Sequence, residues 1–161
     1  DKDSIRFMML NRSNDAQLDF DFEKVKEKTK DNPVFYVQYA YARINSIARA
    51  LKKNLNDEIY VDTKSFNLNE YEEKIYRKVF EWPKIIESAV KKLEPHKIPF
   101  YLYELSTLFH SYWSKGNEDS KYKFIDNGVL KRPETFVFLY LIAIVIRNGM
   151  NILGVSLPEK M

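Results

Sequence analysis

Apolar residues recur at intervals of three and four along most of this chain, which is the spacing of amphipathic α-helices. In the stretch 33–53 they fall in one stripe of a helical projection: Val34, Val37, Tyr41, Ile44, Ala48 and Leu51. Asp31 or Asn32 supplies a capping side chain before this stretch, and Pro33 suits the first helical position. We therefore predict a helix from Pro33 to about Lys53 that buries this stripe.

Start and stop signals predict further helices in the first hundred residues. Asn69 followed three residues later by Glu72 is a capping-box pattern, which marks a helix start. Because proline disrupts a helix interior, this helix is predicted to end before Pro83. A separate helix over 83–93 would bury the apolar stripe Ile85, Ile86, Ala89, Val90 and Leu93. Residues 4–11 have the pattern of a short helix near the N-terminus.

Two longer helices are predicted in the last third of the chain. One runs from the prolines at 95 and 99 through Trp113, and Gly116 is suited to end it. The other opens at Pro133 and ends at Gly154. Between them, residues 117–132 are polar and are predicted to form a loop of more than the usual length.

Composition agrees with an all-α domain. The chain has 161 residues, enough for one domain with a substantial core. Only 4 glycines and 6 prolines interrupt it, about half the usual share. Residues 136–146 are apolar on every side but fall short of the roughly 20 residues that a membrane span needs, and Arg147 follows them. We interpret this run as a central helix of a bundle and expect no membrane association.

Chemistry-bearing residues form no catalytic pattern. The chain has no cysteine, which excludes disulfides, thiolate metal sites and a cysteine nucleophile. No glycine-rich phosphate loop, metal-spaced cluster or nucleophile–base pair is present. His96 is predicted at a helix start and His110 at the edge of the core, while Glu70, Glu72 and Glu73 are interpreted as a solvated helix face. We therefore expect no catalytic residue, bound cofactor or metal in this chain.

The helix over 33–53 carries a second stripe of a different kind. Tyr36, Tyr39 and Arg43 lie well over 90° from the apolar stripe and are neighbours of one another. Tyrosine rings can stack on unpaired bases, and a guanidinium can stack or bind phosphate. The net charge is only +3, so any nucleic-acid site must be local. The alternative is that both tyrosines pack on a neighbouring helix with their hydroxyls at the rim.

Four blocks of sequence are informative: NPVFYVQYAYAR, SIRFMMLNRSNDAQLDFDF, LEPHKIPFYLYELSTLFHSYW and RNGMNILGVSLPEKM. Together they resemble the C-terminal part of arginyl-tRNA synthetases, including the helical DALR anticodon-binding domain of this family. NPVFYVQYAYAR is similar to the segment that opens this domain, and SIRFMMLNRSNDAQLDFDF resembles the transition out of the catalytic domain. LEPHKIPFYLYELSTLFHSYW and RNGMNILGVSLPEKM are similar to its middle and C-terminal helices. The blocks come in family order and span nearly the whole chain. The resemblance implies an all-α helical bundle that receives the anticodon arm of arginine tRNA.

By resemblance, six positions are expected to contact the anticodon: Tyr36, Tyr39, Arg43, Met161, Asn32 and Trp113. The first three match the anticodon-contacting helix, and the turn around Asn32 would lie near the anticodon loop. Trp113 matches less securely, and a core tryptophan is the equal alternative. Where relatives often have histidine this chain has Tyr41, which we place on the inward face as a packing difference.

The resemblance also implies a division of the chain and a parent protein. Residues 1–30 would be the tail of the catalytic domain and 31–161 the DALR domain. The chain starts with Asp rather than Met, so we expect it to be a piece of a longer protein. Without the rest of the catalytic domain, Phe7, Leu10 and Phe20 would lack a packing partner, and the first thirty residues are therefore expected to be partly disordered.

The implied parent is an arginine–tRNA ligase that uses ATP, with Mg²⁺ expected. The His-x-Gly-His and Lys-Met-Ser-Lys-like signatures of its class are missing, so this chain alone is predicted to be non-catalytic. Expected partners are arginine tRNA and the missing catalytic domain, in a cytoplasmic monomer. The lysines of the 114–132 insertion (Lys115, Lys121, Lys123 and Lys131) either touch the tRNA backbone or are simply solvated. The alternative function is a helical protein-interaction module that uses the same aromatic patch.

Overall fold

The structure is a computed structural model that describes residues 2–13, 29, 31–55 and 67–161. These residues form five α-helices, which are α1 (Lys2–Leu10), α3 (Pro33–Ala50), α4 (Glu70–Lys92), α5 (Lys97–Glu118) and α6 (Pro133–Leu153). A 3₁₀ turn, η2 (Ser120–Tyr122), and a two-stranded hairpin of β1 (Ile125–Asp126) and β2 (Val129–Leu130) separate α5 from α6. The all-α prediction is confirmed, with this small hairpin as its one exception in the described ranges.

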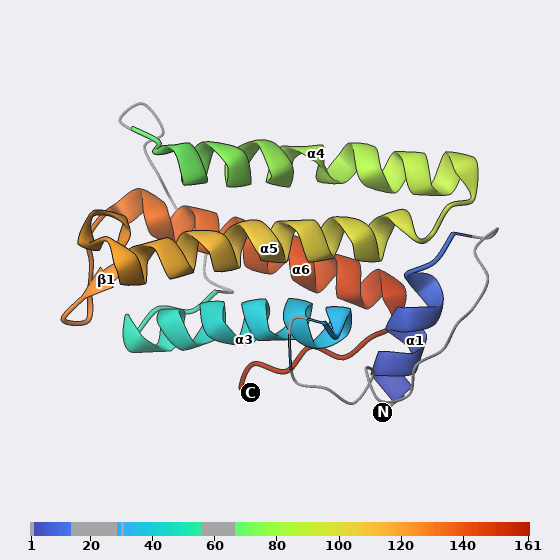
Figure 1. The fold of residues 1–161 in the computed structure, drawn as a ribbon, viewed down its shortest axis with the longest axis horizontal. Helices are drawn as coiled ribbons and strands as arrows, with labels where there is room; N and C mark the ends of the chain where they lie inside the picture. Colours follow the sequence, from blue (N-terminus) through green and yellow to red (C-terminus); the bar gives the residue numbers. More distant parts are fainter. Residues whose placement is uncertain (1, 14–28, 30, 56–66) are drawn as a thin grey trace.

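Four of the helices lie lengthwise in one bundle, and α1 packs at one end (Figure 1). Helix α5 contacts α3, α4 and α6, and α6 also contacts α3 and α4. The apolar run 136–146 lies in α6, where Leu139, Ile142 and Ile146 are almost completely buried. Residues Glu134–Leu153 are long and apolar enough to cross a membrane, but this helix packs against α1, α3, α4 and α5, as the sequence predicted for a central helix.

Helix α3 begins and packs as its sequence predicts. The Asn32 side chain accepts a hydrogen bond from the Phe35 amide, and Pro33 holds the first helical position. Val34, Val37, Tyr41, Ile44 and Ala48 are all buried, and Leu51 packs against the same core. The inward position predicted for Tyr41 is therefore confirmed.

Helix α4 corrects three predictions. The capping box at Asn69 and Glu72 is present, but the helix continues through Pro83 instead of ending before it. Proline removes one backbone hydrogen bond there, and Ile85 and Ile86 beyond it pack against the core, which offsets the loss. The prediction that Val90 and Leu93 are buried is wrong, since they are 68% and 77% exposed. Glu72 does not lie on a solvated face, because its exposure is 0%.

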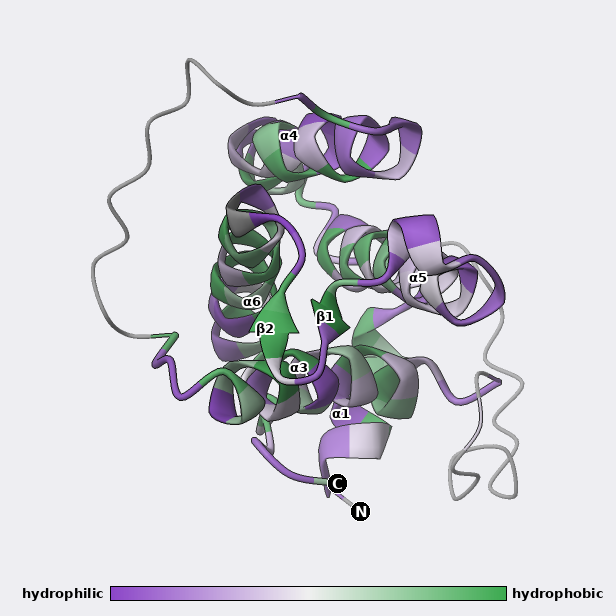
Figure 2. Ribbon diagram, turned by 90° about the vertical axis from the view of Figure 1, so that its left-hand side faces the viewer, coloured by the Kyte–Doolittle hydropathy of each residue, from purple (hydrophilic) through white to green (hydrophobic). Residues whose placement is uncertain are grey.

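The segment after α5 is also more ordered than predicted. Gly116 does not end α5, which runs two residues further. A Cβ atom at Gly116 would lie 2.9 Å from the Tyr122 carbonyl oxygen, so only glycine lets the η2 backbone approach this closely. Asn127 and Gly128 both have positive φ and form the two-residue turn of the hairpin, in which Ile125 pairs with Leu130. The hairpin lies across one end of the bundle (Figure 2).

Helix α1 is part of the core. Phe7 has 0% exposure, Leu10 packs against the buried cluster, and the helix contacts α3 and α6. The expectation that these two residues lack a partner is therefore wrong: the C-terminal half of α6 and the start of α3 supply one. Phe20 lies outside the described residues. After Gly154, whose positive φ ends α6, the tail is fastened to α1 by a hydrogen bond from the Ser156 amide to the Asp3 carboxylate at 3.1 Å.

Candidate nucleic-acid interface

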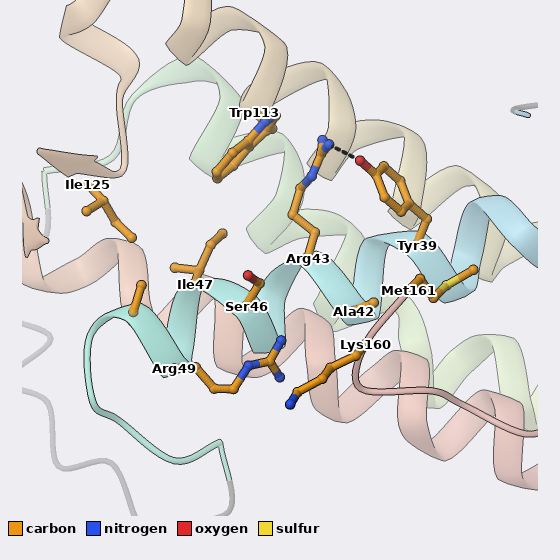
Figure 3. A pocket seen from close by; sticks show the side chains of 11 residues that line it. Tyr39, Ala42, Arg43, Ser46, Ile47, Arg49, Trp113, Ile125, Lys160 and Met161 are labelled. Atoms are coloured by element: carbon orange, nitrogen blue, oxygen red, sulfur yellow. Dashed lines mark hydrogen bonds between the residues drawn. The ribbon is translucent and has the colours of Figure 1, made fainter.

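An open depression lies between α3, α5, the hairpin and the C-terminal tail. Its volume is about 530 Å³, and we call it the α3–α5 hollow (Figure 3). Its walls are made by eleven residues: Tyr39, Ala42, Arg43, Ser46, Ile47, Arg49, Ala50, Trp113, Ile125, Lys160 and Met161. Most of them come from α3, because positions three and four apart repeat along one side of a helix.

The guanidinium of Arg43 is held by two aromatic rings. Its central carbon lies 4.4 Å from the centroid of the Tyr39 ring and 5.0 Å from that of Trp113. Arg43 also donates a hydrogen bond to the Tyr39 hydroxyl, shown as the dashed line in Figure 3. Cation–π contacts of this kind are each worth about 0.5–2 kcal/mol. The cation is therefore fixed at the wall of the hollow, next to two flat rings.

A buried histidine supports this wall from α5. His110 stacks on Tyr39 with the ring centroids 5.6 Å apart and lies 4.4 Å from the Tyr36 ring. Its Nε2 is 3.2 Å from the Tyr36 carbonyl oxygen, so this nitrogen carries the proton and donates. Burial lowers the pKa of His110 to about 4, with the nearby Arg43 charge acting in the same direction. The ring is therefore neutral at pH 7 and serves as packing, as predicted for the core edge.

The C-terminal tail reaches the hollow because side chains of α3 hold it. The Gln38 side chain donates to the Ser156 carbonyl oxygen at 2.9 Å, and the Arg49 guanidinium donates to that of Glu159 at 3.1 Å. Val155 is buried, which anchors the start of the tail. Lys160 and Met161 then lie over α3, and Met161 remains 55% exposed. The tail thus contributes a cation and an apolar side chain to the rim.

The hollow combines aromatic surface with positive charge. Arg43, Arg49 and Lys160 line it, and no acidic side chain is among the described residues that do so. Flat rings accept unpaired bases by stacking, and cations attract the phosphates that join them. Among the described residues no group of three or more His, Cys, Asp or Glu side chains could hold a metal ion. This arrangement suits binding of a single-stranded nucleic acid.

Four of the six predicted contact residues meet in this hollow. Tyr39, Arg43, Trp113 and Met161 all line it, although they come from three separate parts of the chain. Trp113 is half-buried, with its ring edge-on to Phe124 at 5.6 Å, so it is at once a packing residue and a wall of the hollow. Its predicted contact with tRNA stays a prediction.

Tyr36 and Asn32 lie elsewhere. The Tyr36 ring is half-buried between His110 and Tyr103, 5.2 Å from the latter, and burial raises its pKa. This is the packed arrangement of the alternative interpretation, although Tyr36 lies on the same side of α3 as Tyr39 and shares His110 with it. Asn32 is 4% exposed and its side chain caps α3. The structure brings neither into the hollow.

Sequence reasoning missed Ser46, Arg49, Ile125 and Lys160. Ser46 and Arg49 continue the stripe of Tyr39 and Arg43 by two more turns, so extending the same spacing would have found them. Ile125 reaches the hollow through the hairpin, which the Asn127–Gly128 pair between two short apolar segments signals. Lys160 precedes Met161, and nothing local to the tail indicated that α3 would hold both.

The family of the chain is shown by comparison with known proteins. The family described as DALR anticodon binding domain matches residues 37–161. An arginine–tRNA ligase of Pelagibacter ubique is 52% identical over 160 residues, which cover 99% of this chain and 28% of that protein. A second arginine–tRNA ligase, from Ruegeria pomeroyi, is 43% identical over 164 residues, which also cover 99% of this chain and 28% of that protein. The chain thus spans about 28% of the length of the curated relatives it matches.

Solved structures agree on the fold. The arginyl-tRNA synthetase of Plasmodium falciparum superposes with a TM-score of 0.78 at 21% identity, covering 99% of this chain and 26% of that one. The bundle therefore has the helical fold of a segment of that longer protein. The chain belongs to the DALR anticodon-binding domain family.

Proposed function

We propose that this chain is the anticodon-binding part of an arginine–tRNA ligase and that the α3–α5 hollow receives an unpaired nucleotide of the anticodon loop. One observation carries the proposal: a cation fixed between two aromatic rings lies in a hollow whose described lining contains no acidic side chain. The base of this nucleotide would contact the side chains of Tyr39 and Trp113, while Arg43, Arg49 and Lys160 would neutralise the adjoining phosphates. Membership of the DALR family and the names of the relatives support the same partner.

The parent protein is proposed to attach arginine to its tRNA with the use of ATP. That activity would belong to the remaining part of the protein, since the relatives are much longer than this chain. The two ATP-handling signatures of the class do not occur in the sequence. We expect the 161-residue chain to bind the anticodon arm without aminoacylating it.

Electrophoretic titration tests the proposal directly. The 161-residue chain is titrated with an arginine-tRNA anticodon stem-loop and with a non-cognate stem-loop of equal length, at several salt concentrations. The proposal predicts preference for the cognate loop. It also predicts an affinity that falls with salt, by a logarithmic slope of about 0.7 for each single-strand phosphate neutralised. Equal binding of both loops at every salt concentration would instead favour a protein-interaction module and would overturn the proposal.

A further inference from the structure

A second, smaller hollow adjoins the first at Trp113. Its volume is about 210 Å³, and we call it the hairpin hollow. Trp113 and Ile125 line both hollows, so the two meet at these side chains. On the far side of Trp113 the walls include Asn117 at the end of α5, together with Tyr122 and Lys123 from the segment before β1. The aromatic surface at Trp113 therefore continues beyond the α3–α5 hollow.

The hairpin hollow is built on a packed foundation. Phe124 is 4% exposed and its ring packs against Tyr112 at 4.5 Å and Trp113 at 5.6 Å. Lys131 donates its amide hydrogen to the Phe124 carbonyl oxygen at 3.0 Å, which closes the base of the hairpin. Gly116 allows the backbone of Tyr122 to lie against α5. The position of Lys123 relative to Trp113 is thus set by the fold.

The four lysines of this region differ in what they contact. Lys115 pairs with Glu118 at 3.3 Å, Lys131 donates to the Ser120 carbonyl oxygen at 2.7 Å, and the Lys121 ammonium lies over the Tyr122 ring. Lys123 is exposed, and within the described part of the chain its ammonium has no ion pair or hydrogen bond. Of these four lysines, Lys123 is also the one that lines the hairpin hollow.

We propose that the hairpin hollow is a second nucleotide subsite, which takes the loop nucleotide next to the one in the α3–α5 hollow. This inference rests on the proposed function. The base would lie against Trp113 and Tyr122, where the Asn117 amide offers both a donor and an acceptor to a base edge. The Lys123 ammonium would neutralise the adjoining phosphate. The α3–α5 hollow would thus take one unpaired nucleotide, and the hairpin hollow would take a second.

Salt-dependent titration of single-charge variants provides the first test. The 161-residue chain, Lys123→Ala and the control Lys84→Ala, an exposed lysine on α4 that lines neither hollow, are titrated with the arginine-tRNA anticodon stem-loop. Lys123→Ala is expected to reduce the logarithmic salt slope by about 0.7, the value for one single-strand phosphate. Lys84→Ala is expected to leave the slope unchanged. Equal slopes for all three proteins would overturn the subsite.

Abasic substitution in the stem-loop separates this inference from the proposed function. Each loop position in turn carries no base, and affinity is measured for the native chain, for Asn117→Ala and for Tyr39→Ala. We expect that removal of the base lowers the affinity of the native chain at two adjacent loop positions. In Asn117→Ala the loss of affinity should disappear at one of these positions, and in Tyr39→Ala it should disappear at the other. Sensitivity at one position alone would overturn the subsite and leave the proposed function standing. A native chain that binds no stem-loop would overturn both.

Discussion

Arg132 donates a hydrogen bond across 2.8 Å to the carboxylate of Glu72, a side chain with 0% exposure. The other oxygen of this carboxylate accepts a hydrogen bond from the Tyr112 hydroxyl at 2.9 Å. The three residues join the start of α4, the C-terminal half of α5 and the position before α6. The hairpin lies between Tyr112 and Arg132 in the chain, so this cluster links the segments that precede and follow it.

Removal of Arg132 should cost more stability than removal of the Glu72 charge. Arg132→Ala leaves a buried carboxylate without its cation, which is expected to lower the free energy of unfolding by about 3 kcal/mol. Glu72→Gln should cost less, because the Arg132 side chain is 31% exposed and can be hydrated. Urea unfolding measures both. Arg77→Ala, which breaks an exposed pair with Glu73, is the control and should change stability by less than about 1 kcal/mol. A larger loss for Glu72→Gln than for Arg132→Ala would contradict this ordering.

The aromatic and cationic wall of the α3–α5 hollow should carry much of the binding. Tyr39→Ala and Arg43→Ala are each expected to weaken the anticodon stem-loop complex by about 1–3 kcal/mol. Arg43→Lys should weaken it too, since an ammonium keeps the charge but cannot stack as a planar guanidinium does. Fluorescence titration gives the affinities, and circular dichroism checks that each variant is folded. Arg77→Ala is the charge-matched control, and unchanged affinity for both Tyr39→Ala and Arg43→Ala would argue against the hollow as the site.

The two residues at the end of the tail should act in different ways. Met161→Ala removes an apolar contact, so the loss of affinity, about 1 kcal/mol, should be similar at low and high salt. Lys160→Ala removes a charge and should mainly reduce the salt slope. Both side chains are exposed, so the free energy of unfolding should change by no more than about 0.5 kcal/mol. The pattern fails if the two substitutions give the same salt dependence.

His110 should make the fold sensitive to mild acid. Its pKa is about 4 in the folded protein and about 6.5 when unfolded, so below pH 6.5 the unfolded chain binds a proton that the folded chain does not. Stability should therefore fall as the pH drops from 6.5 toward 4, by about 1 kcal/mol between pH 7.5 and 5.5. Urea unfolding at these two values tests this, with His110→Gln expected to flatten the dependence. The same pH dependence in His110→Gln would assign it to another group.

Helix starts and the inward face of α3 could be predicted from the sequence because their causes are local. Asn32 and Asn69 cap their helices through side chains that accept hydrogen bonds from amides within three residues, and such a local pattern can be recognised in the sequence. The continuation of α4 through Pro83 was missed for the opposite reason. A proline favours a break, but the apolar residues on both sides of it pack against the same bundle, and this tertiary contact outweighs the local preference.

The candidate site was predictable in proportion to how much of it lies on one helix. Tyr39 and Arg43 lie on one side of α3, and their spacing of four residues predicts that they are neighbours. The arrangement of Tyr36 differs from the exposed position expected, because Tyr103 and His110 of α5 cover its ring. Ile125 and Lys160 depend on the hairpin and the tail, whose positions are set by contacts between residues far apart in sequence. Such contacts leave no periodic signal.

The α3–α5 hollow has two kinds of wall. One consists of α3 and α5, whose opposite faces form the core, so a substitution there risks unfolding the domain. The other consists of Ile125 of the hairpin and the C-terminal tail, which lie at the edge of the bundle. Related domains can therefore diverge in nucleotide preference by exchanging residues of the second wall while the first stays constant. The hairpin and the tail are where an engineered change of selectivity should begin.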